Sequence, residues 1–178
     1  MSHDSEMRSS LEMLTVANEY CLFFEKADSY STQDILLYFQ KIAPLLYLKA
    51  SLLKPVKIKD ESLNERFVTE EQWEAVFKEL RKKFGSDDQY FVHDHNFDSV
   101  EASLADNMAD IYQDMKDFVM LYQKNTESAR HNANANLVSL FRWHWGPALL
   151  NALASVHRQL FKDEINPDLF ANEEDFLF

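Results

Sequence analysis

The sequence predicts an all-α protein, an antiparallel bundle of four long helices with a shorter third helix packed beside them. The chain has 178 residues with 2 Gly and 4 Pro, too few turn-forming residues for an all-β protein. Apolar residues make up 46% of the chain and recur at helical spacing in five segments. At this length we expect one domain, placed at residues 1–162 and followed by an acidic tail at residues 163–178.

The first two helical segments are expected at residues 6–29 and 31–53. Ser31 followed by Asp34 has the spacing of a helix N-cap. Two apolar stripes run along the second segment, so it should be covered on both sides and form the centre of the bundle. The second of these stripes consists of Tyr38, Leu45, Leu48 and Leu52. Pro44 removes one backbone donor and should kink or split this helix.

A polar connection at residues 54–68 leads to the third, shorter helix. This helix is expected to begin after Thr69, with Gln72 three residues later, and to end at Gly85 as its C-cap. Residues 86–97 are expected to be irregular. We expect their aromatic side chains to hold this segment against the bundle: Tyr90, Phe91 and Phe97.

The fourth and fifth helical segments are expected at residues 98–125 and 126–162. Asp98 with Glu101 three residues later again has the spacing of a helix start. Gly146-Pro147 should bend or interrupt the fifth segment. Apolar residues of the fourth segment alternate in steps of four and three, a seam that suits packing along near-parallel neighbours. This seam consists of Leu104, Met108, Ile111, Met115, Phe118 and Tyr122.

The net charge of the chain limits the classes of binding partner that we expect. The chain has 18 Lys and Arg against 30 Asp and Glu, a net charge of −12, which argues against nucleic acid and anionic membranes as partners. Half of this charge falls in residues 163–178, which end in Phe176-Leu177-Phe178. We interpret this tail either as a free acidic end or as a segment that docks on its own bundle or on a partner.

Other features of the chain predict a cytoplasmic protein. Residues 1–8 lack the pattern of a secretory signal, and the longest apolar run is interrupted by Lys and Pro. Cys21 is the only cysteine, so it has no internal disulfide partner, and its place in an apolar stripe predicts a core residue.

Aspartates of the fourth segment are the most conspicuous acidic cluster. They are Asp106, Asp110, Asp114 and Asp117. They lie opposite the apolar seam, so we expect a solvated face rather than a metal site. Ion pairing with a neighbouring helix is the next interpretation, with Lys116 and Arg142 as counter-charges.

Motifs that carry catalysis or bind metals are missing. The chain has no Glu followed three residues later by His, no pair of His at i and i+4, and no glycine-rich phosphate loop. We therefore predict no metal or cofactor and propose no reaction, and we interpret His93-Asp94-His95 as a hydrated loop. Residues 141–147 hold His144 and Trp145 beside a helix break, and these side chains either line a ligand pocket or fill the core.

Five blocks of the sequence resemble an uncharacterised bacterial family, domain of unknown function 5063. The blocks are residues 15–23, 40–50, 67–73, 109–118 and 144–157, and Trp143 departs from the pattern that we expect. The resemblance implies an all-helical single domain and supplies no activity, substrate or cofactor. The recurring polar residues of the family, as they stand here, are Asp110, Gln113, Asp114, His144 and His157. These residues would meet at one interface if the fourth and fifth segments are neighbours.

Two functional hypotheses follow. In the first, the protein acts without catalysis through contacts with a protein partner. In the alternative, the bundle binds a metal or a small ligand and is potentially an enzyme. The candidate ligand-binding residues are Asp110, Gln113, Asp114, His144, Trp145 and His157. Mimicry of nucleic acid by the acidic surface is a third, minor hypothesis.

Overall fold

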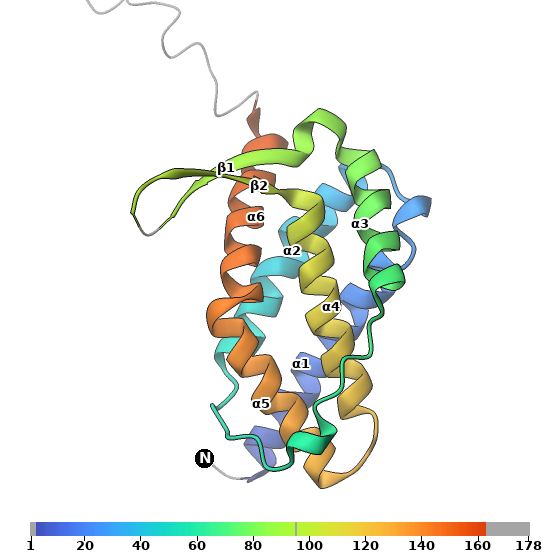
Figure 1. The fold of residues 1–178 in the computed structure, drawn as a ribbon, viewed down its shortest axis with the longest axis vertical. Helices are drawn as coiled ribbons and strands as arrows, with labels where there is room; N and C mark the ends of the chain where they lie inside the picture. The colour runs from blue at the N-terminus through green and yellow to red at the C-terminus, as the bar shows by residue number, and fades with distance from the viewer. Residues whose placement is uncertain (1–2, 95, 163–178) are drawn as a thin grey trace, which may run out of the picture.

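The computed structural model describes residues 3–94 and 96–162 (Figure 1). Its helices and strands are α1 (His3–Phe24), α2 (Thr32–Ser51), α3 (Glu70–Phe84), β1 (Gln89–His93), β2 (Ser99–Ser103), α4 (Leu104–Tyr122), α5 (Glu127–Trp143) and α6 (Trp145–Leu160). Short 3-10 turns lie at Ala27–Ser29, Glu61–Leu63 and Gly85–Asp88. The predicted tail at 163–178 lies outside the described residues.

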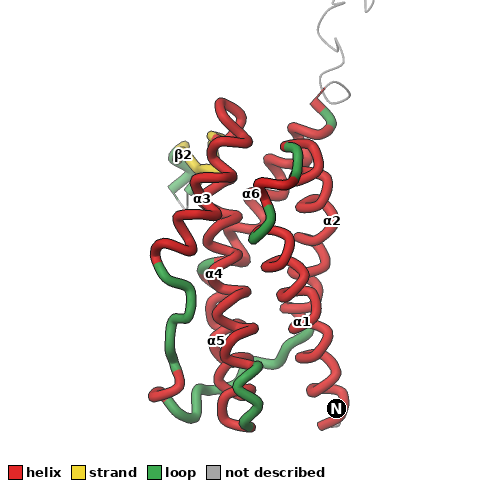
Figure 2. The backbone as a smooth tube through the Cα atoms, turned by 90° about the vertical axis from the view of Figure 1, so that its right-hand side faces the viewer, coloured by secondary structure: helices red, strands yellow, loops and turns green. Residues whose placement is uncertain are grey.

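The molecule is a mostly helical bundle, as predicted (Figure 2). Helices α5 and α6 follow one another along one side, and α3 lies beside the first half of α4. The predicted number of helices is wrong, because the fifth segment forms two helices that meet at His144. The interruption expected at Gly146-Pro147 is thus confirmed, and it falls two residues before that dipeptide.

Helix α4, and not α2, is the centre of the bundle. It contacts α1, α3, α5 and α6, and most of its residues are buried. Helix α2 lies at one edge of the molecule beside α1 (Figure 2). The second stripe of α2 therefore faces solvent over much of its length, with Leu48 53% and Leu52 54% exposed. The prediction of a covered α2 is wrong because an apolar stripe does not specify which element packs on it.

The helix ends follow local sequence signals. Capping boxes at Ser31–Asp34 and Thr69–Gln72 begin α2 and α3 as predicted. Gly85 ends α3 with a φ of +54°, which favours glycine. Pro44 lies inside α2, which continues without a break, so the helix is not split.

Residues 86–97 are not irregular throughout. Strands β1 and β2 form an antiparallel hairpin that projects beyond the bundle, with Gln89 paired to Ser103 and His93 to Ser99 (Figure 1). Helix α4 begins after the hairpin, capped by Ser103, and not at Asp98.

Only one of the three aromatic side chains predicted to hold this segment does so. Tyr90 is buried, whereas Phe91 is 67% and Phe97 86% exposed. The base of the hairpin is held by Asp88, a fully buried residue whose carboxylate accepts hydrogen bonds from Arg81 and from the backbone N–H of Ala105, both at 2.7 Å.

Two other predictions can be compared with the described residues. Cys21 is fully buried in the core, as predicted. Among the helices described, none combines the length and the apolar character that a membrane span requires.

Candidate functional site

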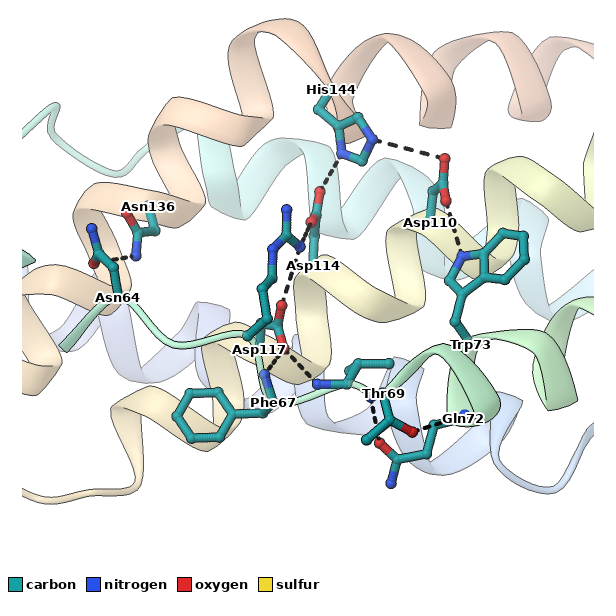
Figure 3. Close-up of polar contacts among 12 residues, drawn as sticks. Asn64, Phe67, Thr69, Gln72, Trp73, Asp110, Asp114, Asp117, Asn136 and His144 are labelled. Atoms are coloured by element: carbon teal, nitrogen blue, oxygen red, sulfur yellow. Dashed lines mark hydrogen bonds and ion pairs between the residues drawn. The ribbon is translucent and has the colours of Figure 1, made fainter. Parts of the chain in front are cut away.

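The aspartates of α4 do not form a solvated face. The carboxyl group of Asp114 is fully buried and that of Asp117 nearly so, while Asp110 is half-buried and Asp106 alone is exposed. Helix α3, residues 64–68 and the junction of α5 with α6 cover this side of α4 (Figure 3). The prediction from helix spacing is wrong because it places polar residues opposite a seam without regard to a second covering layer.

Asp114 lies between two cationic side chains. His144 Nδ1 lies 2.6 Å from Asp114 Oδ2, and Arg66 Nη1 donates to Asp114 Oδ1 at 3.3 Å (Figure 3). Arg66 Nη1 also donates to Asp117 Oδ2 at 3.1 Å. The Nε2 atom of His144 lies 3.8 Å from Asp110 Oδ2. We call these five residues the Asp114 cluster.

Neither predicted counter-charge belongs to this cluster. Lys116 pairs at 2.6 Å with Glu25, which follows α1. Arg142 is exposed and makes no ion pair within residues 3–94 and 96–162. The ion pairing of the aspartates is real, but its partners are Arg66 and His144.

The same carboxylates hold the connection before α3. Asp117 Oδ1 accepts from the backbone N–H groups of Phe67 and Val68 at 2.8 and 2.9 Å. Asp110 Oδ1 accepts from Trp73 Nε1 at 3.0 Å. Residues 66–73 are therefore fastened to α4 at three points.

From the other side, α5 also holds this connection. The amide of Asn132, which is fully buried, accepts from the backbone N–H of Lys59 at 3.1 Å and donates to the carbonyl of Asp60.

The break between α5 and α6 places His144 in the cluster. The backbone of His144 leaves the helical region, with a φ of −117° and a ψ of −87°. A Cβ atom on Gly146 would lie 2.1 Å from the Phe141 carbonyl oxygen, so only glycine permits this close turn. Trp145 is fully buried and donates from Nε1 to the Leu137 carbonyl at 3.2 Å, which anchors the turn in the core.

Electrostatics favour the protonated form of His144. The hydrogen bond with Asp114 raises its pKa, and the charges of Asp114 and Asp110 act in the same direction, while burial opposes them. Burial is also the main cause that raises the pKa of Asp110, followed by the charge of Asp106. His144 is therefore a cation over a wider pH range than a free imidazole.

The structure brings together three of the six candidate residues: Asp110, Asp114 and His144. Trp145 is a core residue and does not line the cluster. Gln113 is half-buried on α4, and no hydrogen bond described links its side chain to the cluster. His157 is exposed near the end of α6, with its ring 4.8 Å from that of Phe161.

Sequence reasoning missed Arg66 and Trp73 as members of this region. Arg66 contacts an aspartate 48 positions away, and it lies in a polar connection with no helical pattern to orient it. For Trp73 the only signal in the sequence is a general one, because a buried indole N–H usually has a polar partner.

A cavity of about 230 Å³ opens beside the cluster, which we call the Asp114 cavity. One wall is charged and contains Arg66, Asp114 and Asp117. The lining also includes the polar residues Asn64, Glu65, Asn136 and Ser139. Its apolar part, which we call the floor, comes from α4 and α5 and consists of Phe118, Leu121, Ala133, Leu137 and Leu140.

The described residues give no support to a metal centre. Within residues 3–94 and 96–162, no three His, Cys, Asp or Glu side chains are arranged to hold an ion. The His93-Asp94-His95 sequence lies only partly within the described chain. Asp94 there accepts hydrogen bonds from the backbone N–H groups of Asn96 and Asp98, as in an ordinary turn.

The matches to known proteins extend over nearly all of the described residues. A family model described as a domain of unknown function (DUF5063) matches residues 5–162. The crystal structure of protein BF1032 from Bacteroides fragilis is similar, with 32% sequence identity and a TM-score of 0.76, over 84% of this chain and 90% of that chain. No protein of curated function matches. The family match therefore includes every element that contributes to the cluster and brings no named ligand.

Proposed function

The chain belongs to the DUF5063 family, and from its site we propose that the protein binds a small molecule in the Asp114 cavity. One observation carries this proposal: a fully buried carboxylate, balanced by Arg66 and His144, forms part of the wall of an open cavity. His144 contacts carboxylates on both ring nitrogens, so the cluster offers fixed charge rather than an activated nucleophile. Binding is therefore proposed, and not a reaction.

The energetics support a binding role. Burying an ion pair costs several kcal/mol in desolvation, which apolar packing of the same volume would avoid. Asp117 and Asp110 already hold residues 67–73 against α4, because they accept hydrogen bonds from backbone N–H groups and from Trp73. Asp114 adds a third carboxylate and two cations next to unfilled space, which is the arrangement expected of a polar ligand site.

A thermal-shift and NMR screen with a library of small metabolites tests this proposal. A ligand at 100 times its Kd adds about 2.7 kcal/mol to the free energy of unfolding. Ser139 is exposed and lines the cavity, so Ser139→Trp should block the mouth and abolish the shift. Ser128→Trp, on the exposed side of the same helix, is the matched control. A library without ligands, or equal binding by both variants, would contradict the proposal.

A second candidate function is contact with another protein through the α1–α2 face. This face consists of the exposed residues Met7, Leu11, Leu45, Leu48 and Leu52. Its two helices are joined by the Lys49–Glu12 ion pair at 2.8 Å, and Met7 and Leu52 line one further cavity. Exposed apolar residues on two adjacent helices support an interaction site.

The partner proposed for this face is a second copy of the chain. The leucines of α2 recur at heptad-like spacing, which allows the same stripe of two molecules to pair across a twofold axis. Sedimentation at increasing protein concentration should show a dimer that Leu48→Glu abolishes. Leu150→Glu, an exposed leucine of α6, should leave the dimer intact. A wild-type monomer at all concentrations would refute this candidate.

A further inference from the structure

We propose that the ligand of the Asp114 cavity is a small organic acid whose carboxylate binds the free edge of Arg66. This inference rests on the proposed binding function and deepens it by naming the ligand class. It follows from a comparison of the hydrogen-bond donors and acceptors at the wall of the cavity.

The acceptors of the wall are already in use. Asp117 receives two backbone N–H groups on Oδ1 and Arg66 on Oδ2. Asp114 receives Arg66 on Oδ1 and His144 on Oδ2. The carboxyl group of Asp114 has no exposed surface and that of Asp117 is only 13% exposed, so an amine ligand gains little access to either.

Donors at the wall remain available. Arg66 reaches both aspartates through Nη1 alone, so Nε and Nη2 make no hydrogen bond within the described chain, and the side chain is 57% exposed. Asn64 contributes only its Oδ1, which accepts from Asn136 at 2.9 Å, so its amide nitrogen is also available. A planar guanidinium with an open edge matches the two oxygens of a carboxylate.

The local charge permits an anion although the whole chain is acidic. Glu65, the third acid of the cavity wall, pairs with Lys124 at 3.2 Å. Arg66 and His144 together balance Asp114 and Asp117 when the imidazole is protonated, which its raised pKa favours. Asp110, which lies on α4 like Asp114, faces His144. Burial raises the pKa of Asp110, so its negative charge, which repels an anion, is smallest at mildly acidic pH.

The floor of the cavity limits the rest of the ligand. Phe118, Leu137 and Leu140 give the same cavity an apolar surface. The volume of about 230 Å³ is below the roughly 300–1,000 Å³ typical of sites for drug-sized molecules. The acid should therefore carry a short aliphatic body rather than an aromatic or nucleotide moiety.

Three compounds with one carbon skeleton test the ligand class: pentanoate, pentanamide and pentylamine. Calorimetry and NMR on the full chain should show that pentanoate binds at least about tenfold more tightly than the other two. Arg66→Met should lower the affinity for pentanoate by a similar factor, whereas Arg142→Met, an exposed arginine without an ion pair, should not. Arg66→Lys keeps the charge and should retain part of the affinity for pentanoate. This variant replaces Arg66→Met in the test if Arg66→Met does not fold.

The outcomes separate the two proposals. Tighter binding of pentylamine, or metabolite hits in the Asp114 cavity that lack an anionic group, would overturn the ligand class and leave the binding function standing. Unchanged affinity of Arg66→Met for pentanoate would overturn the role of Arg66. A complete absence of ligands in both experiments would overturn the binding function itself, and the ligand class with it.

Discussion

At the scale of single residues, Asp114 determines the electrostatics of the site. Its carboxylate has no exposed surface and depends on Arg66 and His144 for compensation. Removal of Arg66 or His144 would leave the buried charge of Asp114 less compensated. That loss costs more free energy than the loss of a partner at an exposed site. Asp106, about two turns away on the same helix, is exposed and has no such dependence.

Asp114→Asn should destabilise the protein by about 2 kcal/mol or more, since it leaves His144 and Arg66 without their shared anion. The pKa of His144 should fall toward its ordinary value, because its largest raising cause is removed. Urea unfolding measures the first effect and an NMR titration the second. Asp106→Asn is the control, and an unchanged His144 pKa in Asp114→Asn would show that the pairing is wrong.

Stability should also depend on pH through His144. Its folded pKa is raised above 6.5, so its contribution is fully present below pH 6.5 and is lost as the pH rises through the folded value. The raised pKa of Asp110 acts in the same direction at lower pH, because the folded state holds that proton more tightly. Above pH 6.5 the free energy of unfolding should therefore fall as the pH rises, and His144→Gln should flatten this dependence while His157→Gln does not.

At the scale of elements, the junction of α5 and α6 is the feature that builds the site. Gly146 lets the chain turn against Phe141, Trp145 locks the turn in the core, and His144 is thereby directed at α4. A continuous helix through this region would carry His144 past the cluster. The break is thus a positioning device and not merely a change of direction.

Gly146→Ala should destabilise the protein by about 1–3 kcal/mol, because the added methyl group would overlap the Phe141 carbonyl. Loss of the His144–Asp114 hydrogen bond should accompany it, visible as a changed imidazole shift. Gly85→Ala is the comparison: a φ of +54° with a ψ of −122° strains any L side chain, so it should also lower stability, but nothing lies within 4 Å and the imidazole shift of His144 should not change. Equal effects of the two substitutions on this shift would refute this account.

Local signals explain which elements were predictable. Ser31 and Thr69 begin helices by contacts within four residues, and the sequence contains those contacts in full. The strands were missed because five-residue segments without a glycine turn carry a weak signal, and Asp98 with Glu101 imitates a helix cap. The helical period places Leu48 and Asp114 on faces but does not reveal whether another element covers those faces.

The site was predictable only in part for the same reason. Asp110, Asp114 and His144 stood out because they recur in the family that the sequence resembles, and they meet because the junction of α5 and α6 packs on α4. Arg66 lies in a connection whose path over α4 is set by Asp117 and Asn132, residues far from it in sequence. The Arg66–Asp114 pair depends on the assembled fold, so no periodic pattern in the sequence predicts it.

At the scale of the whole molecule, stability should be uneven. Helix α4 is enclosed by four other helices, whereas residues 54–68 hold little regular secondary structure and are fastened mainly through side chains, among them Asp117 and Asn132. Native-state hydrogen exchange should therefore be slower in α4 than in this connection. Asn132→Ala should speed exchange at Lys59 more than Asn136→Ala, and uniform protection of both regions would contradict this order.

The hairpin has a practical consequence. Its root is clamped by Asp88 to α3 and to the first turn of α4, and its far end leaves the bundle altogether. Phe91 and Phe97 on this arm contribute little to the core because most of their surface is in solvent. A fluorophore or an epitope attached to the hairpin should therefore label the protein without disturbing the helices or the Asp114 cavity.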